Sequence, residues 1–359
     1  MFFKECALGD VVTFQRGRDL PRSKMVNGPY PVLGSNGIIG YHNEFTTTGP
    51  VVVVGRSGNV GKPFMVRSNA WAHNTSLYIK DFHGNDPIFI YYFLKTLNLS
   101  SFAGGSAVPT LNRNHINNIK IKIPENINDQ KIIGNFLSTL DLKIETNNKI
   151  ICTLESLAIS NIQFNTNIKE KTVADYAEIN PKRIIKKGTK ARHIDMSALS
   201  TTNSIPISYD FKKYSGGVKF SNGDTLLARI TPCLENGKAA FINILDKEEV
   251  AFGSTEFIVF HSKGILPNEF FYCLIKTDDF RKFIIKRLTG TSGRQRISAD
   301  DVGKYPLPIF LDDQIKYFNK TLPLLFSCIA SYGRQNSTLR RLQDALLDKL
   351  IYGEIRIQK

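Results

Sequence analysis

The chain has 359 residues, of which 42% are hydrophobic and 22% are charged, and its formal net charge at pH 7 is +15. This length allows two or three domains with separate cores, and the excess of Lys and Arg favours a polyanionic partner, with nucleic acid first. Basic composition that serves only solubility is the alternative.

The five cysteines are scattered without any close pair, which argues against a disulfide framework or a zinc site and fits a reducing compartment. No apolar run approaches the length of a membrane span, and the first residues lack the pattern of a signal peptide. We therefore expect a cytoplasmic protein that does not associate with membranes and binds no metal.

Residues 1–125 have the pattern of a compact α/β domain built from short strands and turns. The run Val51 to Val54 predicts a buried strand, and Trp71 to Ile79 predicts a second strand. Pro87 marks the start of a helix. A glycine-rich loop follows, and a short strand, Ile119 to Ile123, ends at Pro124.

Residues 126–168 are dominated by one long amphipathic stretch, Asp129 to Thr166. Its seam positions recur with alternating spacings of three and four residues, which is the heptad repeat of a coiled coil. These positions are Ile133, Leu137, Leu140, Ile144, Asn147, Ile151 and Leu154. A helix of this length would extend about 55 Å at 1.5 Å per residue.

Residues 169–308 repeat the order of the first domain. VADYAEIN resembles the opening LGDVVTFQ, and DTLLARI matches VVVVGRS, so that Arg229 corresponds to Arg56. A strand from Phe252 to His261, a helix after Pro267 and a second glycine-rich loop then follow in the same sequence. Because the features recur in order, we interpret the chain as a tandem duplication of a domain plus a helix.

Residues 309–359 contain the second long helix, which we expect to run from Asp312 towards Tyr352. Its predicted seam is Leu322, Leu325, Ile329, Leu339, Leu342 and Leu346, with a slip in the spacing before Leu342. Pro323 should kink this helix or break it. Two such helices bury their seams most economically against each other, so we predict an antiparallel coiled coil with pseudo-twofold symmetry between two globular α/β (α+β) domains.

In this arrangement the chain resembles a specificity subunit of a Type I restriction-modification enzyme. The resemblance covers nearly the whole length and rests on two segments: the Pro, Asp-Gln and LSTLDLKIE run between 124 and 145, and the C-terminal LRRLQDALLDKLIYGEIRI run between 339 and 357. Asp129 stands where the family commonly has Glu, and Pro323 interrupts the second helix.

The resemblance implies that each globular domain is a target recognition domain that reads one half of a bipartite DNA sequence. The helices would set the spacing of the half-sites and dock two methyltransferase subunits, with restriction and translocase subunits joining for cleavage. The chain itself would be non-catalytic and would carry no cofactor. S-adenosylmethionine, ATP and magnesium would be bound by the partners, which would methylate adenine and cleave DNA.

The turns of both copies supply the donors that DNA binding requires, since Arg, Asn and Gln can bond bases bidentately and Lys suits phosphates. In the first copy the candidates are Arg16, Arg18, Arg22, Lys24, Arg56, Lys62, Asn112 and Arg113. In the second copy they are Lys187, Lys190, Arg192, Arg229, Lys238, Arg287, Arg294, Gln295 and Arg296. A single surface Arg is more often merely solvated, so the clusters carry more weight than any member.

Enzymatic motifs are incomplete. GRSGNVGKP has the wrong glycine spacing for a phosphate-binding loop, and Pro63 stands where Ser or Thr must hold magnesium. Asn180-Pro181 begins like a DNA methyltransferase motif but lacks its second Pro and its aromatic residue. Two other functions remain open: a scaffold whose two domains bind proteins, and a self-sufficient DNA modification enzyme. Asn147 is interpreted as a residue that sets the register of the seam.

Overall fold

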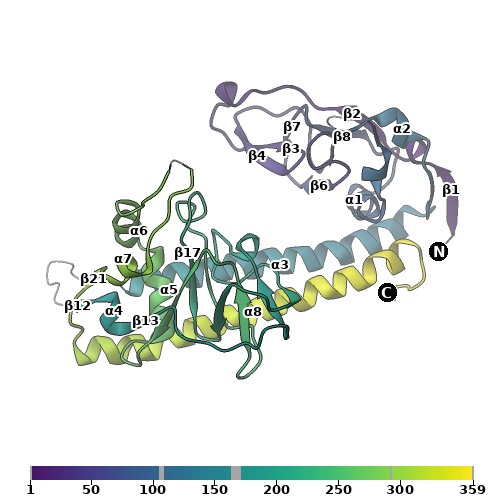
Figure 1. Cartoon of the computed structure of the whole chain (residues 1–359). Helices are drawn as coiled ribbons and strands as arrows, with labels where there is room; N and C mark the ends of the chain where they lie inside the picture. Colours follow the sequence, from purple (N-terminus) through teal and green to yellow (C-terminus); the bar gives the residue numbers. More distant parts are fainter. Residues whose placement is uncertain (1, 105–108, 163–170, 292, 358–359) are drawn as a thin grey trace. The chain divides into compact units, whose positions relative to one another are not determined.

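The computed structural model in Figure 1 describes residues 2–104, 109–162, 171–291 and 293–357. The chain divides into two compact units: unit 1 comprises Met1–Lys143 and Thr338–Lys359, and unit 2 comprises Ile144–Ser337. Both boundaries lie inside long helices, because each globular part packs on its own portion of each helix. The four segments expected from the sequence therefore remain a prediction about domain bounds.

Unit 1 contains two main sheets. The larger is antiparallel and has the strand order β2-β8-β5-β6, and the smaller has the order β4-β3-β7. The strands of these sheets are β2 (Thr13–Arg16), β3 (Tyr30–Gly34), β4 (Gly37–His42), β5 (Val51–Gly55), β6 (Pro63–Val66), β7 (Trp71–Ala72) and β8 (Ser76–Asp81). Two ribbons complete the unit: β1 (Phe3–Ala7) with β11 (Lys120–Pro124), and β9 (Ala103–Gly104) with β10 (Thr110–Leu111).

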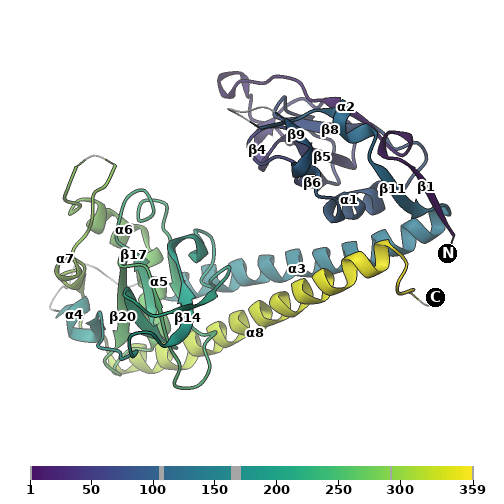
Figure 2. The ribbon, with the colours of Figure 1, turned by 45° about the vertical axis from the view of Figure 1, so that its right-hand side comes forward.

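Helix α1 (Pro87–Thr96) joins the larger sheet to the long helix α3 (Ile127–Asn161). The side chain of Asp86 caps α1 by accepting from the backbone N–H of Phe89 at 2.8 Å. Gly134 of α3 lets the two helices approach closely, since a Cβ there would lie 2.8 Å from the backbone nitrogen of Phe89. Figures 1 and 2 show α1 between β6 and α3.

Unit 2 repeats this plan. Its first sheet has the order β13-β20-β17-β18, which matches β2-β8-β5-β6 strand for strand, and its second sheet has the order β15-β14-β19-β16. The strands are β13 (Ala177–Ile179), β14 (Lys190–Ile194), β15 (Asp210–Lys213), β16 (Val218–Ser221), β17 (Thr225–Ala228), β18 (Ala239–Phe241), β19 (Val250–Gly253) and β20 (Phe257–Ser262). A ribbon of β12 (Lys171–Thr172) with β21 (Pro306–Leu307) corresponds to β1 with β11.

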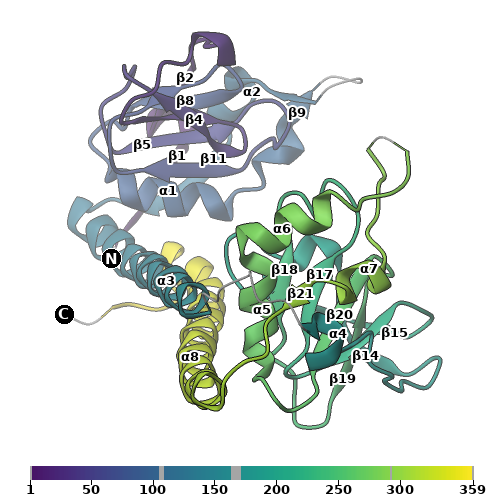
Figure 3. The ribbon, with the colours of Figure 1, turned by 90° about the vertical axis from the view of Figure 1, so that its left-hand side faces the viewer.

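Helix α5 (Asn268–Lys276) takes the place of α1. Its Tyr272 ring packs on the ring of Phe326 in the long helix α8 (Asp312–Ile351), with centroids 5.7 Å apart. Figure 3 shows α5 between the sheet of unit 2 and α8. The shorter helices are η1 (Leu8–Asp10), η2 (Arg22–Lys24), η3 (Leu99–Phe102), α2 (Arg113–Asn117), α4 (Val173–Tyr176), η4 (Met196–Ala198), α6 (Asp278–Ile285) and α7 (Ala299–Gly303). The shared sheet order confirms the predicted duplicated α/β fold.

Two predicted strands are wrong at the same place in each copy. The stretch Trp71 to Ile79 divides into β7 and β8, and Phe252 to His261 divides into β19 and β20. A turn separates each pair, closed in unit 1 by the bond from the N–H of Ser76 to the carbonyl of His73 at 3.0 Å. The chain therefore passes from one sheet to the other at this turn.

The helices α3 and α8 pair through a heptad seam in which every seventh residue is buried. The buried positions are Leu137, Ile144, Ile151 and Ala158 in α3, and Leu322, Ile329, Asn336, Gln343 and Leu350 in α8. Ile133 and Asn147 are also buried, whereas Leu140, Leu154, Leu325, Leu339 and Leu346 are half-buried. In unit 2, Asn147 bonds Asn336 and Tyr317 bonds Asn161, so the two segments run antiparallel.

Leu342 does not lie in the seam. Its side chain is 41% exposed, and Gln343 occupies the buried position instead. Gln343 is accepted there because its Nε2 donates to Oδ1 of Asp141 at 2.9 Å. The heptad thus continues without the predicted slip.

Of the two outcomes expected at Pro323, the break of the second helix is wrong, and the kink stays a prediction. Helix α8 continues through Pro323 from Asp312 to Ile351. The neighbouring side chains Leu322 and Phe326 are buried in the core of unit 2. This packing offsets the cost of roughly 3 kcal/mol that an interior proline imposes on a helix. The part of the predicted first helix between 163 and 166 lies outside the described residues.

Candidate nucleic-acid interface

The predicted DNA-binding side chains of unit 1 concentrate where strands of the larger sheet end together. In the register of this sheet, Arg16 and Val54 both lie opposite Leu77, and Val54 also lies opposite Pro63. Four strand ends therefore meet at one edge of the sheet: the end of β2, the start of β8, the end of β5 and the start of β6. We call the segments there, 16–20, 55–62, 72–76 and 109–113, the loop edge of unit 1.

Backbone hydrogen bonds fix these segments to one another. The N–H of Arg18 donates to the carbonyl of Ala72 at 2.8 Å, which holds the first loop on the turn between β7 and β8. The N–H of Arg56 donates to Thr75 at 2.9 Å, and the carbonyl of Arg56 accepts from the N–H of Leu111 at 2.8 Å. The side chains of this edge thus project from a fixed frame.

Unit 2 has the same frame. The N–H of Arg229 donates to the carbonyl of Glu256 at 2.9 Å, and its carbonyl accepts from the N–H of Ile297 at 3.0 Å. Arg229, Glu256 and Ile297 therefore correspond to Arg56, Thr75 and Leu111. We call the segments 229–238, 254–257 and 294–297 the loop edge of unit 2.

The two frames carry different side chains. At the first loop edge, Oγ1 of Thr75 lies 2.9 Å from Nδ1 of His73, whose pKa is lowered by burial so that the imidazole is neutral at pH 7. At the second, the carboxylate of Glu256 binds the guanidinium of Arg296 in two places, with Nε 3.0 Å from each oxygen. Equivalent backbone positions thus present neutral groups in unit 1 and charged groups in unit 2.

The charge arrangement at the second loop edge keeps Glu256 ionised. Hydrogen bonds from Arg296, together with the charges of Arg296 and Arg229, lower the pKa of Glu256. The Nε of Arg229 is itself buried and has no hydrogen-bond partner among the described residues.

The loop edges bring together eleven of the seventeen predicted side chains. They are Arg16, Arg18, Arg56, Lys62, Asn112 and Arg113 in unit 1, and Arg229, Lys238, Arg294, Gln295 and Arg296 in unit 2. The others lie on different segments: Arg22 and Lys24 in η2, Lys187 just before β14, Lys190 and Arg192 in β14, and Arg287 after α6. Arg16, Arg18, Arg22, Lys24, Lys62, Asn112, Arg113, Lys187, Lys190, Arg287 and Arg294 are exposed.

Arg192 differs from its predicted role and serves the fold of unit 2. Its side chain is 8% exposed, and its guanidinium forms ion pairs with Asp246 at 3.3 Å and Glu249 at 3.2 Å. It also lies over the ring of Tyr209, 4.5 Å from the centroid. All of these contacts are internal, so this arginine is not presented to DNA.

Lys238 also forms a hydrogen bond within unit 2, because its Nζ donates to the carbonyl of Met196 at 2.9 Å.

Glu256 lies at the loop edge of unit 2 but was not predicted from the sequence. The repeat could have indicated it. In each copy one turn residue binds the backbone N–H of the repeated arginine, and in the second copy this turn residue is acidic.

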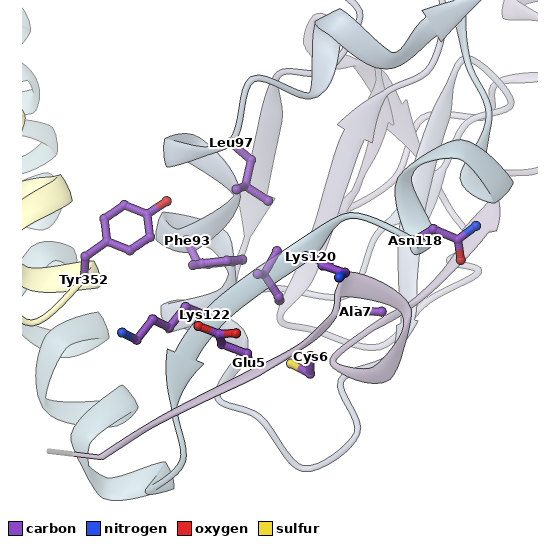
Figure 4. A pocket seen from close by; sticks show the side chains of 10 residues that line it. Glu5, Cys6, Ala7, Phe93, Leu97, Asn118, Lys120, Lys122 and Tyr352 are labelled. Atoms are coloured by element: carbon purple, nitrogen blue, oxygen red, sulfur yellow. The ribbon is translucent and has the colours of Figure 1, made fainter.

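A separate hollow in unit 1 has a volume of about 720 Å³ and lies between the β1–β11 ribbon and the end of α1 (Figure 4). Glu5, Lys120, Lys122, Phe93 and Tyr352 are among the side chains that line it. None of the predicted DNA-binding residues is among them, so the hollow is not part of the loop edge.

Within the described ranges, no group of three or more His, Cys, Asp and Glu residues could hold a metal ion. A search of the same residues finds no helix that is both long and apolar enough to cross a membrane.

Sequence comparison matches the two copies separately. A family model described as the Type I restriction modification DNA specificity domain matches residues 3–156 and again residues 165–316.

Three curated relatives are specificity subunits of Type I restriction enzymes. The EcoAI subunit of Escherichia coli is 31% identical over 143 residues, which is 38% of this chain and 24% of the relative. The EcoEI subunit of the same organism is 28% identical over 164 residues, or 44% of this chain and 27% of the relative. The MjaIX subunit of Methanocaldococcus jannaschii is 25% identical over 320 residues and aligns with 76% of this chain and 69% of its own length. The chain thus spans only about a quarter of the first two relatives.

Among solved structures, the S subunit of a Type I restriction-modification system from M. genitalium is similar in fold. The TM-score is 0.61 at 17% identity, and the match covers 98% of this chain and 96% of the other.

Proposed function

Since the chain belongs to the family of Type I restriction modification DNA specificity domains, we propose that it is the sequence-specific DNA-binding subunit of such a system. Each unit would contact one half of a bipartite target through its loop edge. The chain would be non-catalytic, and adenine methylation and ATP-dependent cleavage would be carried out by partner subunits. Those partners would bind S-adenosylmethionine, ATP and magnesium, and the assembly would act in the cytoplasm.

One observation carries this proposal. The loop edges of the two units share a backbone frame around Arg56 and Arg229 but differ in the side chains that the frame presents. A protein that reads two different half-sites with a duplicated domain needs this combination, because the frame sets position and the side chains set sequence. A scaffold with incidental basic charge would have no such requirement.

The long helices support the second part of the proposal. They would set the distance between the half-sites and provide the docking surface for two methyltransferase subunits, with restriction and translocase subunits joining that complex. The buried residues of α3 and of α8 recur at heptad spacing, which is the pattern that a coiled-coil spacer requires.

DNA binding at increasing salt tests the proposal. The chain, assembled with its methyltransferase subunits, should lose about 10³- to 10⁵-fold in affinity for duplex DNA between 50 and 200 mM salt if it makes roughly six to ten phosphate contacts. Arg18→Ala should reduce the salt slope by about one. Lys149→Ala changes an exposed lysine of α3 that is not part of either loop edge; it is the matched control and should leave the slope unchanged. Binding that does not depend on salt would instead favour a protein-binding scaffold.

A further inference from the structure

Arg296 is held more firmly than the other arginines of the loop edges. Its backbone N–H donates to the carbonyl of Thr289 at 2.8 Å, and its carbonyl accepts from the N–H of Thr289 at 3.0 Å. The next residue, Ile297, donates to Arg229 at 3.0 Å. The backbone on both sides of this side chain is therefore fixed to two separate segments.

The far end of the side chain is fixed as well. Glu256 accepts from Nε of Arg296 at 3.0 Å and from Nη2 at 2.7 Å, so its carboxylate lies along one side of the guanidinium. Nη1 donates to the carbonyl of Arg294 at 3.3 Å. A planar group held in this way has lost most of its freedom before any ligand arrives.

Two donors of the guanidinium remain. One N–H of Nη1 and one N–H of Nη2 have no acceptor among the described residues, and because Glu256 occupies the Nε side, the remaining N–H of Nη2 is the one at the end of the guanidinium. The side chain of Arg296 is 43% exposed, whereas that of Glu256 is 25% exposed. These N–H donors suit the N7 and O6 acceptors that guanine presents in the major groove.

We propose that Arg296 reads a guanine in the half-site contacted by unit 2, and that Glu256 is the positioning residue that orients its guanidinium. This assignment rests on the proposed function. Unit 1 has Thr75 at the position of Glu256 and Thr110 at the position of Arg296, so these two positions form an arginine–carboxylate pair in unit 2 and not in unit 1. The guanine should therefore belong to one half of the target.

The first experiment maps methylated adenines in cells that co-express the methyltransferase subunit with each variant. Arg296→Lys keeps the charge but removes the guanidinium, and it should reduce discrimination for one guanine in one half-site by about 10- to 100-fold. Glu256→Gln should relax the same position to a smaller extent. Arg356→Lys is the matched control, because Arg356 is exposed and belongs to neither loop edge nor the predicted DNA-binding residues, and it should retain the wild-type motif.

The second experiment alters the DNA base that Arg296 is proposed to contact. The wild-type assembly binds duplexes in which 7-deazaguanine, which lacks the N7 acceptor, replaces guanine at the identified position. Affinity should fall about tenfold for wild type and remain unchanged for Arg296→Lys. If both proteins lose affinity equally, or if Arg296→Lys keeps the wild-type motif, Arg296 is only a structural clamp and the assignment is overturned. A wild-type chain that directs no bipartite motif would overturn the proposed function itself.

Discussion

Asn147 of α3 and Asn336 of α8 form a hydrogen bond inside the helical seam of unit 2, with Nδ2 of Asn147 2.9 Å from Oδ1 of Asn336. Both side chains are buried. Asn336 in turn donates to Asn148 at 2.9 Å, so three amides form one connected group. Because a shift of either helix by one turn would separate these groups, they hold α3 and α8 in a single register.

Asn336→Leu should destabilise the protein by about 1–3 kcal/mol, since the buried amide of Asn147 would lose its 2.9 Å bond and keep only the longer bond to Gln335 at 3.5 Å. Urea unfolding measures the change. Asn135→Leu, at an exposed position of α3, is the control and should lie within about 0.5 kcal/mol of wild type. The double variant Asn147→Leu/Asn336→Leu should recover most of the loss, and equal losses in the single and double variants would contradict a specific pair.

Lengthening both helices together should lengthen the gap in the DNA target. The variant has one heptad inserted after Asn147 in α3 and one before Asn336 in α8. These insertions preserve the seam and add about 10 Å to each helix. At about 34 Å per DNA turn this corresponds to roughly three base pairs. A heptad in α3 alone is the control and should abolish modification. Methylation mapping that returns an unchanged gap would show that the helices do not set the spacing.

Gly134→Ala should destabilise unit 1 although alanine is the better helix former. In an open helix this change would stabilise by about 1 kcal/mol, but here the new Cβ would lie 2.8 Å from the backbone nitrogen of Phe89. We expect a loss of about 1–3 kcal/mol in the free energy of unfolding. Gly216→Ala is the control, because nothing lies within 4 Å of a Cβ there. A more stable Gly134→Ala variant would refute the close packing of α1 on α3.

Glu155 should make the stability of unit 2 depend on pH. Burial raises its pKa, although hydrogen bonds from Ser204, the charge of Lys276 and Tyr272 oppose the shift. The folded protein therefore binds this proton more tightly than the unfolded chain, whose pKa is near 4.5. The stability that Glu155 contributes is full below that pH and is lost as pH rises through the raised value.

Glu155→Gln should consequently gain stability relative to wild type between pH 4 and pH 7, as measured by urea unfolding across that range. Glu145→Gln is the control, since Glu145 is exposed on the same helix beside Lys149. If the difference between Glu155→Gln and wild type does not change with pH, Glu155 is not protonated more readily in the folded state.

The fold could be predicted from the sequence as far as local periodicity and repetition reach. The heptad of α3 depends on residues that are close in sequence. The proline before each short helix, at Pro87 and Pro267, and the pair Arg56 and Arg229 depend on the repeat. The division of each second strand could not be predicted, because the turn at His73–Thr75 contains neither glycine nor proline.

The candidate site was predictable only in outline. Clusters of Arg and Asn in corresponding loops mark the loop edges, but the role of each side chain depends on distant partners. Arg192 is buried because Asp246 and Glu249, more than fifty residues away, meet it. Gln343 replaces Leu342 in the seam because Asp141 of the other helix accepts its hydrogen bond.

Genome-wide mapping of methylated adenines, in cells that co-express the chain with its methyltransferase subunit, measures whether this chain directs modification to a bipartite target. We expect a single bipartite motif: two short, different half-sites separated by a gap of fixed length. A continuous motif, or no modification above that of the methyltransferase subunit alone, would contradict this expectation.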